Sequence, residues 1–137
     1  MRSGYNERVN KQPTTWISGL VLHGDQTGRT INFPSLNLEP SLWPANLRTS
    51  PGVYAAKVRV GGNEYMGALY YGPRLVKGET HNVLEIHVLD FTADVYDQFV
   101  EFQVGAFVRP PMDFISLLAL KEQLASDVSI VKSKLLR

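Results

Sequence analysis

The spacing of apolar residues divides the chain into a strand-rich part followed by a helical part. From Val53 to Val60, apolar and polar side chains alternate with the period of two that is typical of a half-buried β-strand. Gly61-Gly62-Asn63 follows and predicts a hairpin turn, because glycine readily adopts the positive φ that such turns require. A returning strand is expected at 64–71. The same alternation predicts further strands at 83–89 and 99–107.

After Pro110-Pro111 the apolar period changes to that of a helix. The positions that recur at helical spacing are Phe114, Leu117, Leu118, Leu124, Val128, Val131 and Leu135. Ser116 is a suitable N-cap, and Ser126-Asp127 is interpreted as a point where the helix restarts. Several short strands followed by one amphipathic helix predict a mostly β fold, a small closed barrel with the helix packed outside.

Length and charge limit the classes of protein that the chain can belong to. A chain of 137 residues is most simply one domain, which we place at 16–137 behind a polar tail at 1–15. Lys and Arg number 14 against 13 Asp and Glu, so we expect no nucleic-acid partner and no membrane partner. With no cysteine there is no disulfide framework or thiolate chemistry. The polar start at Met1–Gln12 does not resemble a secretory signal, and we expect a cytoplasmic monomer.

The segment from Gly19 to Asn37 carries the densest candidate chemistry. It runs from an apolar strand into a Gly-x-x-x-Gly-Arg turn, then into Phe-Pro-Ser-x-Asn. Glycines let backbone N–H groups approach phosphate oxygens, and Arg29 offers a forked cationic donor. Ser35 and Asn37 supply hard oxygen ligands of the kind that magnesium accepts. The residues needed for a phosphate and magnesium site therefore lie close together in the sequence.

The glycine turn in this segment differs from a Walker P-loop. Three residues separate Gly24 from Gly28, where the P-loop has four, and Arg29-Thr30 stands in place of Lys-Ser/Thr. A turn with two glycines is also common as a purely structural feature. The turn alone therefore leaves both interpretations open.

Glu85 is the second candidate. On a strand, Leu84, Ile86 and Val88 share one face, while Glu85 and His87 share the other. If the first face points into the core, Glu85 is an ordinary exposed carboxylate. If the second lines the mouth of a barrel, Glu85 is an acceptor suited to holding a substrate hydroxyl. His87 either orients Glu85 or is a surface residue.

Taken in order, the motifs are more specific than any one of them. They are Gly19-x-Val21-x-x-Gly24-x-x-x-Gly28-Arg29, Phe33-Pro34-Ser35-Leu36-Asn37-Leu38, Pro51-Gly52-Val53-Tyr54, Leu84-Glu85-Ile86-His87-Val88-Leu89-Asp90-Phe91, Val108-Arg109-Pro110, Asp113-Phe114-x-Ser116-Leu117-x-x-Leu120 and Asp127. This series closely resembles the riboflavin kinase (flavokinase) family, including the kinase module of bifunctional bacterial FAD synthetases, over about residues 16–136. The resemblance implies a six-stranded Greek-key β-barrel with a C-terminal α-helix outside it.

The resemblance also implies a reaction and a role for each motif. The expected activity is ATP-dependent transfer of the γ-phosphate to the ribityl 5′-hydroxyl of riboflavin, giving FMN and ADP. Glu85 would activate that hydroxyl as a base, and Ser35 and Asn37 would hold a divalent cation, Mg²⁺ with Zn²⁺ or Mn²⁺ as alternatives. The remaining roles implied are nucleotide binding by Gly24, Gly28, Arg29, Asn32 and Pro34, and flavin binding by Arg109 and Phe114.

The chain departs from the family pattern at several positions. Serine replaces threonine at 35, Leu36 is bulkier than the usual alanine, and Asn32 stands where glycine is usual. The segment 71–75 only loosely matches the family's Gly-x-x-Pro-Thr turn. Two other classes are therefore kept: a catalytically weak flavin- or nucleotide-binding module of the same fold, and a translation-factor-like nucleic-acid binder. The near-neutral charge disfavours the second.

Overall fold

The computed structural model describes residues 15–23, 34–74 and 81–135. Its elements in chain order are β1 (Ile17–Leu20), β2 (Leu36–Leu38), the short 3-10 helices η2 (Pro40–Leu42) and η3 (Ala45–Leu47), β3 (Gly52–Val60), β4 (Asn63–Pro73), β5 (Asn82–Val88), β6 (Phe99–Arg109) and α2 (Leu117–Leu135). The four longer predicted strands are all present, and each extends past its predicted range at one end or both, while β5 also ends one residue early, at Val88. The hairpin turn is confirmed, since Gly61 and Gly62 have φ of 57° and 86°.

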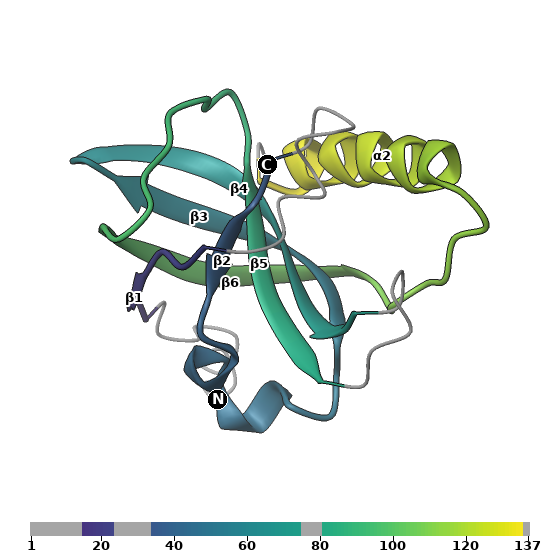
Figure 1. Ribbon diagram of the computed structural model, residues 1–137, viewed down its shortest axis with the longest axis horizontal. Coiled ribbons are helices and arrows are strands. Elements are labelled where there is room, and N and C mark those ends of the chain that lie inside the picture. The colour runs from purple at the N-terminus through teal and green to yellow at the C-terminus, as the bar shows by residue number, and fades with distance from the viewer. Residues whose placement is uncertain (1–14, 24–33, 75–80, 136–137) are drawn as a thin grey trace, which may run out of the picture.

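The strands form one antiparallel sheet in the order β1-β6-β3-β4-β5-β2. Strands β3, β4 and β5 follow one another as a meander, and β6 returns to lie beside β3, which is a Greek key. The sheet curls until its two end strands approach (Figure 1). There the backbone N–H of Leu22 donates to the carbonyl of Asn37 at 2.7 Å. A nearly closed Greek-key barrel is therefore confirmed.

The main core fills the inside of this barrel. Its largest fully buried side chains are Trp43, Leu69, Leu84, Ile86 and Phe102. The Trp43 ring stacks on Tyr71 with ring centroids 4.9 Å apart. Because side chains alternate between the two faces of a strand, the neighbours of these core residues point outward.

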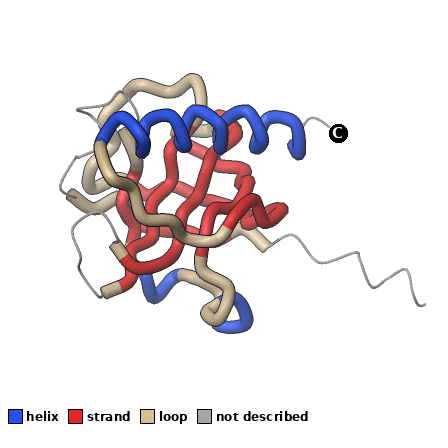
Figure 2. The backbone as a smooth tube through the Cα atoms, turned by 90° about the vertical axis from the view of Figure 1, so that its right-hand side faces the viewer, coloured by secondary structure: helices blue, strands red, loops and turns tan. Residues whose placement is uncertain are grey.

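Helix α2 packs across the outside of the barrel (Figure 2). A second, smaller cluster of buried residues joins them: Ala55, Ala68, Leu89 and Val131, with Met66, Val108 and Val128 packed against it. Alanine on β3 and β4 leaves room for the helix to approach the sheet closely. The predicted helix outside a barrel is confirmed.

The start of α2 agrees only in part with the sequence pattern. Ser116 caps it as predicted, its Oγ accepting from the Ala119 N–H at 3.1 Å. The prediction of a restart at Ser126-Asp127 is wrong, because the helix is continuous through these residues. The Asp127 carboxylate is instead buried against a residue of the barrel. Leu117 and Leu118 were expected on the packed face but are 48% and 66% exposed, since the first turn extends past the sheet.

Candidate active site

One row of cross-strand neighbours contains three of the residues singled out in the sequence. Asn37 on β2 pairs with Glu85 on β5, and Glu85 pairs with Tyr70 on β4. Tyr70 pairs with Val53 on β3, which in turn pairs with Arg109 on β6. Residues directly opposite on antiparallel strands project to the same face of a sheet. We call these five residues the site row; it lies on the outer face of the barrel, because Leu84, Ile86, Leu69 and Tyr54 point into the core.

The cation-binding candidates lie at the β2 end of this row. Asn37 is directly opposite Glu85, although the two are far apart in the sequence. Ser35 lies just before β2, two residues from Asn37, a spacing that puts both side chains on one side of an extended segment. The fold therefore brings an amide, a hydroxyl and a carboxylate to one end of the site row.

The structure meets the premise of the first alternative for Glu85 but not its consequence, and the role of Glu85 toward a substrate hydroxyl stays a prediction. Leu84, Ile86 and Val88 do face the core, yet the Glu85 side chain is only 26% exposed rather than freely solvated. Its Oε2 lies 3.3 Å from Nη2 of Arg74, which is itself 17% exposed. The guanidinium stabilises the negative charge of the carboxylate by Coulomb attraction that is screened less than at an open surface. Glu85 is thus held on the outside of the barrel, partly shielded from water.

His87 holds the segment that precedes β2. Its Nδ1 lies 2.8 Å from the carbonyl oxygen of Pro34, so a protonated Nδ1 donates to that carbonyl. The interpretation of His87 as a residue that orients Glu85 has no support in this contact. Its described role is to fasten Pro34, and with it Ser35, to strand β5.

A cavity opens beside Ser35, on the side of the sheet that faces the core rather than on the outer face with Glu85. It is lined by Pro34, Ser35, Leu36 and Val88 together with Phe91–Tyr96 from the segment between β5 and β6. Tyr96 is stacked on His23, with ring centroids 4.3 Å apart, and His23 Nε2 lies 3.4 Å from Asp97 Oδ2. This cavity was not anticipated from the sequence. The motif ending at Phe91 leads directly into its wall and was the available signal.

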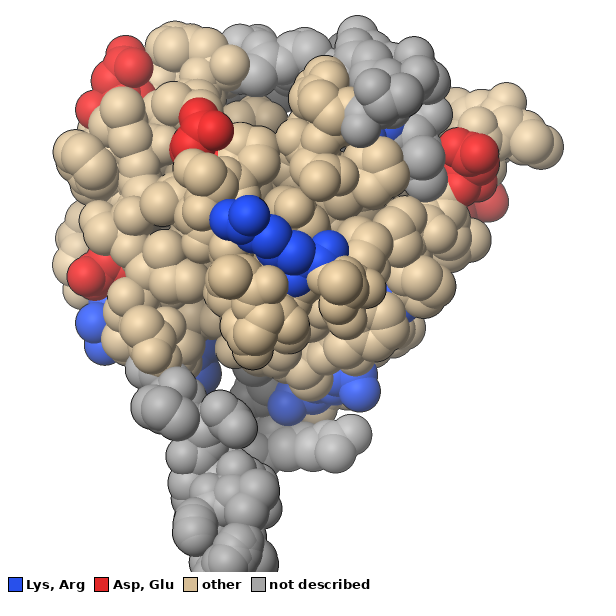
Figure 3. Space-filling model, turned by 90° about the horizontal axis from the view of Figure 1, so that it is seen from below, with Lys and Arg blue, Asp and Glu red and all other residues tan. Residues whose placement is uncertain are grey.

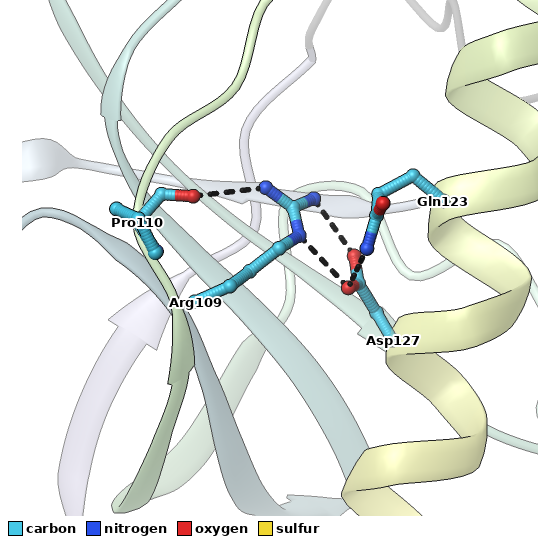
Figure 4. A network of polar contacts seen from close by, with 4 residues as sticks. All are labelled: Arg109, Pro110, Gln123 and Asp127. Atoms are coloured by element: carbon cyan, nitrogen blue, oxygen red, sulfur yellow. Dashed lines mark hydrogen bonds and ion pairs between the residues drawn. The ribbon is translucent and has the colours of Figure 1, made fainter.

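Arg109 ends the site row on the far side. Its Nε and Nη2 each donate at 2.8 Å to the two carboxylate oxygens of Asp127 on α2, and its Nη1 donates to the Pro110 carbonyl (Figure 4). Gln123 adds a hydrogen bond to the same carboxylate at 3.1 Å. Asp127 is 1% exposed and the Arg109 side chain 13%. The guanidinium therefore joins β6 to the middle of α2.

Phe114 lies near this ion pair, with the Arg109 Cζ 5.9 Å from the centre of its ring. The two residues assigned to flavin binding are therefore neighbours in space. Their role toward a flavin stays a prediction, because these contacts describe how they are held and not what they bind.

Tyr70 occupies the centre of the row and was missed in the sequence. Burial, foremost, raises the pKa of the Tyr70 phenol to about 12; Arg109 acts in the opposite direction, and Glu85 and Asp113 add to the rise. The phenol is therefore within electrostatic range of charges on both sides of it. Its alternation with the core residues Leu69 and Tyr71 was the only sequence signal that it faces outward.

Four of the assigned nucleotide-binding residues lie outside the described residues: Gly24, Gly28, Arg29 and Asn32. Residues on either side of that segment are described. His23 precedes it and contacts the wall of the cavity, and Pro34, the fifth assigned residue, lines the cavity itself.

The surface charge is mixed. Figure 3 shows Lys and Arg side chains in separate groups, with acidic side chains between and around them, on the face seen from below. Such a surface lacks the continuous basic stripe typical of nucleic-acid binding, as far as the described residues on this face go. Among the helices that the structure describes, none combines the length and the apolar character needed to cross a membrane.

Comparisons with known proteins identify the family. The model of the family described as "Flavokinase: Riboflavin kinase" matches residues 12–135. The bifunctional riboflavin kinase/FMN adenylyltransferase of Escherichia coli (strain K12) is 37% identical over 114 residues, which are 81% of this chain and 35% of that protein. The corresponding protein of Haemophilus influenzae is 35% identical over 120 residues, 85% of this chain and 37% of that protein.

Two solved structures are similar to the described fold. Riboflavin kinase from Trypanosoma brucei superimposes with a TM-score of 0.61 at 25% identity, covering 89% of this chain and 80% of that one. A structure titled macrolide-efflux protein from Streptococcus pneumoniae superimposes with a TM-score of 0.72 at 27% identity, covering 87% of this chain and 38% of that one. The chain spans little more than a third of the bacterial bifunctional relatives. Because the family model covers nearly the whole sequence, the chain belongs to the riboflavin kinase (flavokinase) family.

Proposed function

We propose that this chain is an ATP-dependent riboflavin kinase, which forms FMN and ADP from riboflavin and ATP. The observation that carries the proposal is the direct pairing of Asn37 with Glu85 across β2 and β5. It brings a candidate cation ligand and a candidate base, from distant parts of the chain, to one place on the outer face of the barrel. The family supports the same reaction.

In this proposal Glu85 is the catalytic base. The ribityl 5′-hydroxyl oxygen forms a bond to the γ-phosphorus, the bond from that phosphorus to the β,γ-bridging oxygen breaks, and the hydroxyl proton passes to the Glu85 carboxylate. ADP leaves with the bridging oxygen. Phosphoryl transfer has a loose transition state, so most of the acceleration comes from positioning and charge neutralisation. Arg74, 3.3 Å from Glu85, holds the carboxylate in its place.

The side chains before and on β2 fit a divalent cation. Ser35 offers a hydroxyl oxygen and Asn37 an amide oxygen, and both are hard ligands of the kind that Mg²⁺ takes alongside phosphate oxygens. We propose Mg²⁺, with Zn²⁺ and Mn²⁺ as the alternatives. When bound, such an ion neutralises phosphate charge. No ligand geometry beyond these two side chains is implied.

The cavity beside Ser35 is the proposed place for the nucleoside part of ATP. It adjoins Ser35, one of the two proposed cation ligands, and its wall from Phe91 to Tyr96 contains two aromatic rings suited to a flat base. Pro34 lines it directly. We propose nucleotide contacts for Gly24, Gly28, Arg29 and Asn32 on the family resemblance alone, because these four lie outside the described residues.

The flavin is proposed to lie at the opposite end of the site row. From Asn37 to Arg109 the row crosses four pairs of strands, and at about 4.8 Å a pair it is about 19 Å long. The row is long enough for an extended substrate with its hydroxyl end at Glu85 and its ring near Arg109 and Phe114. Val53 in the row is 4% exposed, so such a substrate passes along the half-buried Tyr70 without contacting Val53. Met112, an exposed apolar side chain in the segment that follows β6, suits a flat aromatic ring. We propose that the protein works as a monomer in the cytoplasm.

The test is direct. Purified protein is incubated with riboflavin, ATP and Mg²⁺, and FMN is followed by chromatography. ATP-dependent appearance of FMN is the expected result. No FMN above a control without ATP would refute the proposed kinase activity.

A second candidate is a module that binds flavin or nucleotide with little turnover. It is favoured by Leu36, which lines the cavity where the family usually has alanine and so reduces the space for a nucleotide. The distinguishing result is a preparation that carries bound FMN but does not convert riboflavin when ATP is added.

A further inference from the structure

Tyr70 lies where the proposed substrate would cross the barrel. Its Cα partner on one side is Glu85, the proposed base. Its partner on the other side is Val53, which is followed in the row by Arg109 at the flavin end. A substrate that reaches from Arg109 to Glu85 along the row therefore passes over Tyr70.

The Tyr70 phenol is surrounded by charged groups from different parts of the fold. The charged groups that shift the pKa of the phenol are Arg109 at the end of β6, Glu85 on β5 and Asp113 in the segment before α2. Burial dominates these influences and raises the pKa of the phenol to about 12, so its hydroxyl stays protonated at physiological pH. Tyr70 is therefore a neutral, half-buried group between the two charged ends of the row.

The orientation of the ring is fixed by its own strand. The Tyr70 hydroxyl donates to the carbonyl of Pro73 at 2.5 Å. Gly72, with φ of 153°, leaves the space that this hydroxyl needs, because a Cβ at that position would lie 2.8 Å from it. With its proton committed to Pro73, the hydroxyl oxygen still has lone pairs with which to accept a hydrogen bond. A ring held in this way loses little entropy when a ligand binds.

We propose that Tyr70 is a positioning residue for the polyol chain of the acceptor. Its ring lies beneath the chain, and its hydroxyl oxygen accepts a hydrogen bond from one of the chain's secondary hydroxyls. This holds the terminal hydroxyl at Glu85 and makes the site prefer flavins that carry a polyol over those that do not. The inference rests on the proposed function, since it requires that a flavin occupies the site row.

The test compares the substitution Tyr70→Phe with a matched control, Tyr54→Phe. The Tyr54 hydroxyl also donates to a backbone carbonyl, that of Ser50 at 2.6 Å, but its ring is in the core inside the barrel. Each change therefore removes one tyrosine-to-carbonyl hydrogen bond. Binding is measured by quenching of flavin fluorescence for two ligands, riboflavin and lumiflavin. Lumiflavin has the same ring system with a methyl group in place of the polyol.

For Tyr70→Phe we expect the Kd for riboflavin to rise by about 3- to 10-fold, the effect of losing one neutral hydrogen bond, while the Kd for lumiflavin stays unchanged. The KM for riboflavin should rise in step, and the KM for ATP should not change. Tyr54→Phe should leave both flavin affinities at the parental values. If Tyr70 had a purely structural role, the substitution would instead change the Kd values of both flavins by the same factor.

The two proposals fail in different ways. Parental protein that binds riboflavin, combined with equal effects of Tyr70→Phe on both flavins or no effect on either, would overturn the role of Tyr70 and leave the proposed function standing. Parental protein that binds neither riboflavin nor lumiflavin would overturn the proposed function, and the role of Tyr70 with it.

Discussion

Glu85 and Asn37 acquire their importance from the strand register rather than from their own chemistry. Each is an ordinary polar residue on a strand whose other face is in the core. Their direct opposition, with Arg74 beside the carboxylate, makes a compact polar site. At the scale of single residues, the proposed reaction therefore depends on two side chains that can each be changed without disturbing the barrel interior.

Substitution of Glu85 by Gln removes the proposed base and keeps the size of the side chain. We expect kcat to fall by about 10²- to 10⁴-fold, the usual contribution of general-base catalysis, while riboflavin affinity and thermal stability change little. The measurement is steady-state FMN formation together with flavin binding.

Glu64→Gln is the matched control. Glu64 lies at the β3–β4 hairpin, 50% exposed, with Oε1 at 4.0 Å from Arg59. The Glu64→Gln variant should form FMN at the parental rate. If Glu85→Gln also formed FMN at the parental rate, Glu85 would be excluded as the base.

Substitution of Asn37 by Ala removes one proposed cation ligand. We expect the Mg²⁺ concentration for half-maximal activity to rise, with little change in flavin binding, because an oxygen ligand has been lost from the ion. The measurement is a magnesium titration of FMN formation. Asn46→Ala, an exposed asparagine in η3, is the control. Superimposable titrations of Asn37→Ala and parental protein would exclude Asn37 as a ligand.

The sequence motifs predicted Asn37, Glu85 and Arg109 in the site row but not Tyr70, which lies between Glu85 and Arg109. Asn37 and Glu85 occur in ordered motifs that a family resemblance can carry. Tyr70 is in no such motif, and only the pairing of β4 with β5 shows that it shares their face. Arg109 was predicted as a flavin contact, whereas its carboxylate partner 18 positions away on α2 required the packed structure.

At the scale of elements, helix α2 is fastened to the barrel by the buried pair of Arg109 and Asp127. Two hydrogen bonds of 2.8 Å join the groups, and Gln123 supports the carboxylate. The pair also fixes the end of β6, from which the segment with Phe114 leaves. The Arg109–Asp127 pair therefore links the packing of α2 to the position of the proposed flavin end of the site row.

Substitution of Asp127 by Ala leaves the Arg109 guanidinium partly buried and without its carboxylate. Breaking a buried pair by removing one partner costs about 3–5 kcal/mol, so we expect the free energy of unfolding to fall by about that amount. The measurement is urea denaturation. Glu122→Gln, a change at an exposed position five residues earlier on α2, should alter the free energy of unfolding by less than about 0.5 kcal/mol. If Asp127→Ala lowered the free energy of unfolding by no more than Glu122→Gln does, the pair would not fasten α2 to the barrel.

Element types were predictable because each depends on local pattern. Alternation predicted the strands, two adjacent glycines predicted the hairpin, and Ser116 predicted the helix start. The helix was expected to restart at Asp127 because an acidic residue after serine is typical of a helix N-terminus. That interpretation was wrong since the same carboxylate is used in a tertiary contact that local pattern does not contain.

At the scale of the whole molecule, strand order creates the site. The strands β2 and β5 are far apart in the sequence but pair directly at one end of the strand order, while the curl of the sheet brings the end of β1 back toward β2. Periodicity predicts that strands exist but not which of them pair, so the site row was invisible to it. The resemblance supplied the topology, and the Leu22–Asn37 bridge shows where the two ends of the curled sheet meet.

Ligands should stabilise the molecule as a whole if the site is formed as proposed. A ligand at about 100 times its Kd adds about 2.7 kcal/mol to the free energy of unfolding, for which we expect Tm to rise by about 5–15 °C. The measurement is thermal unfolding with riboflavin, with ADP and Mg²⁺, and with duplex DNA. DNA should have no effect. Stabilisation by DNA but not by the flavin or the nucleotide would favour a nucleic-acid binder.

The most direct test of the central claim is a crystal structure of the chain with FMN, ADP and Mg²⁺ bound together. We expect the Mg²⁺ to contact the side chains of Ser35 and Asn37, the FMN phosphate to lie beside the Glu85 carboxylate, and the flavin to lie along the site row toward Arg109. A cation held elsewhere, or an FMN phosphate on another face of the barrel, would contradict the central claim.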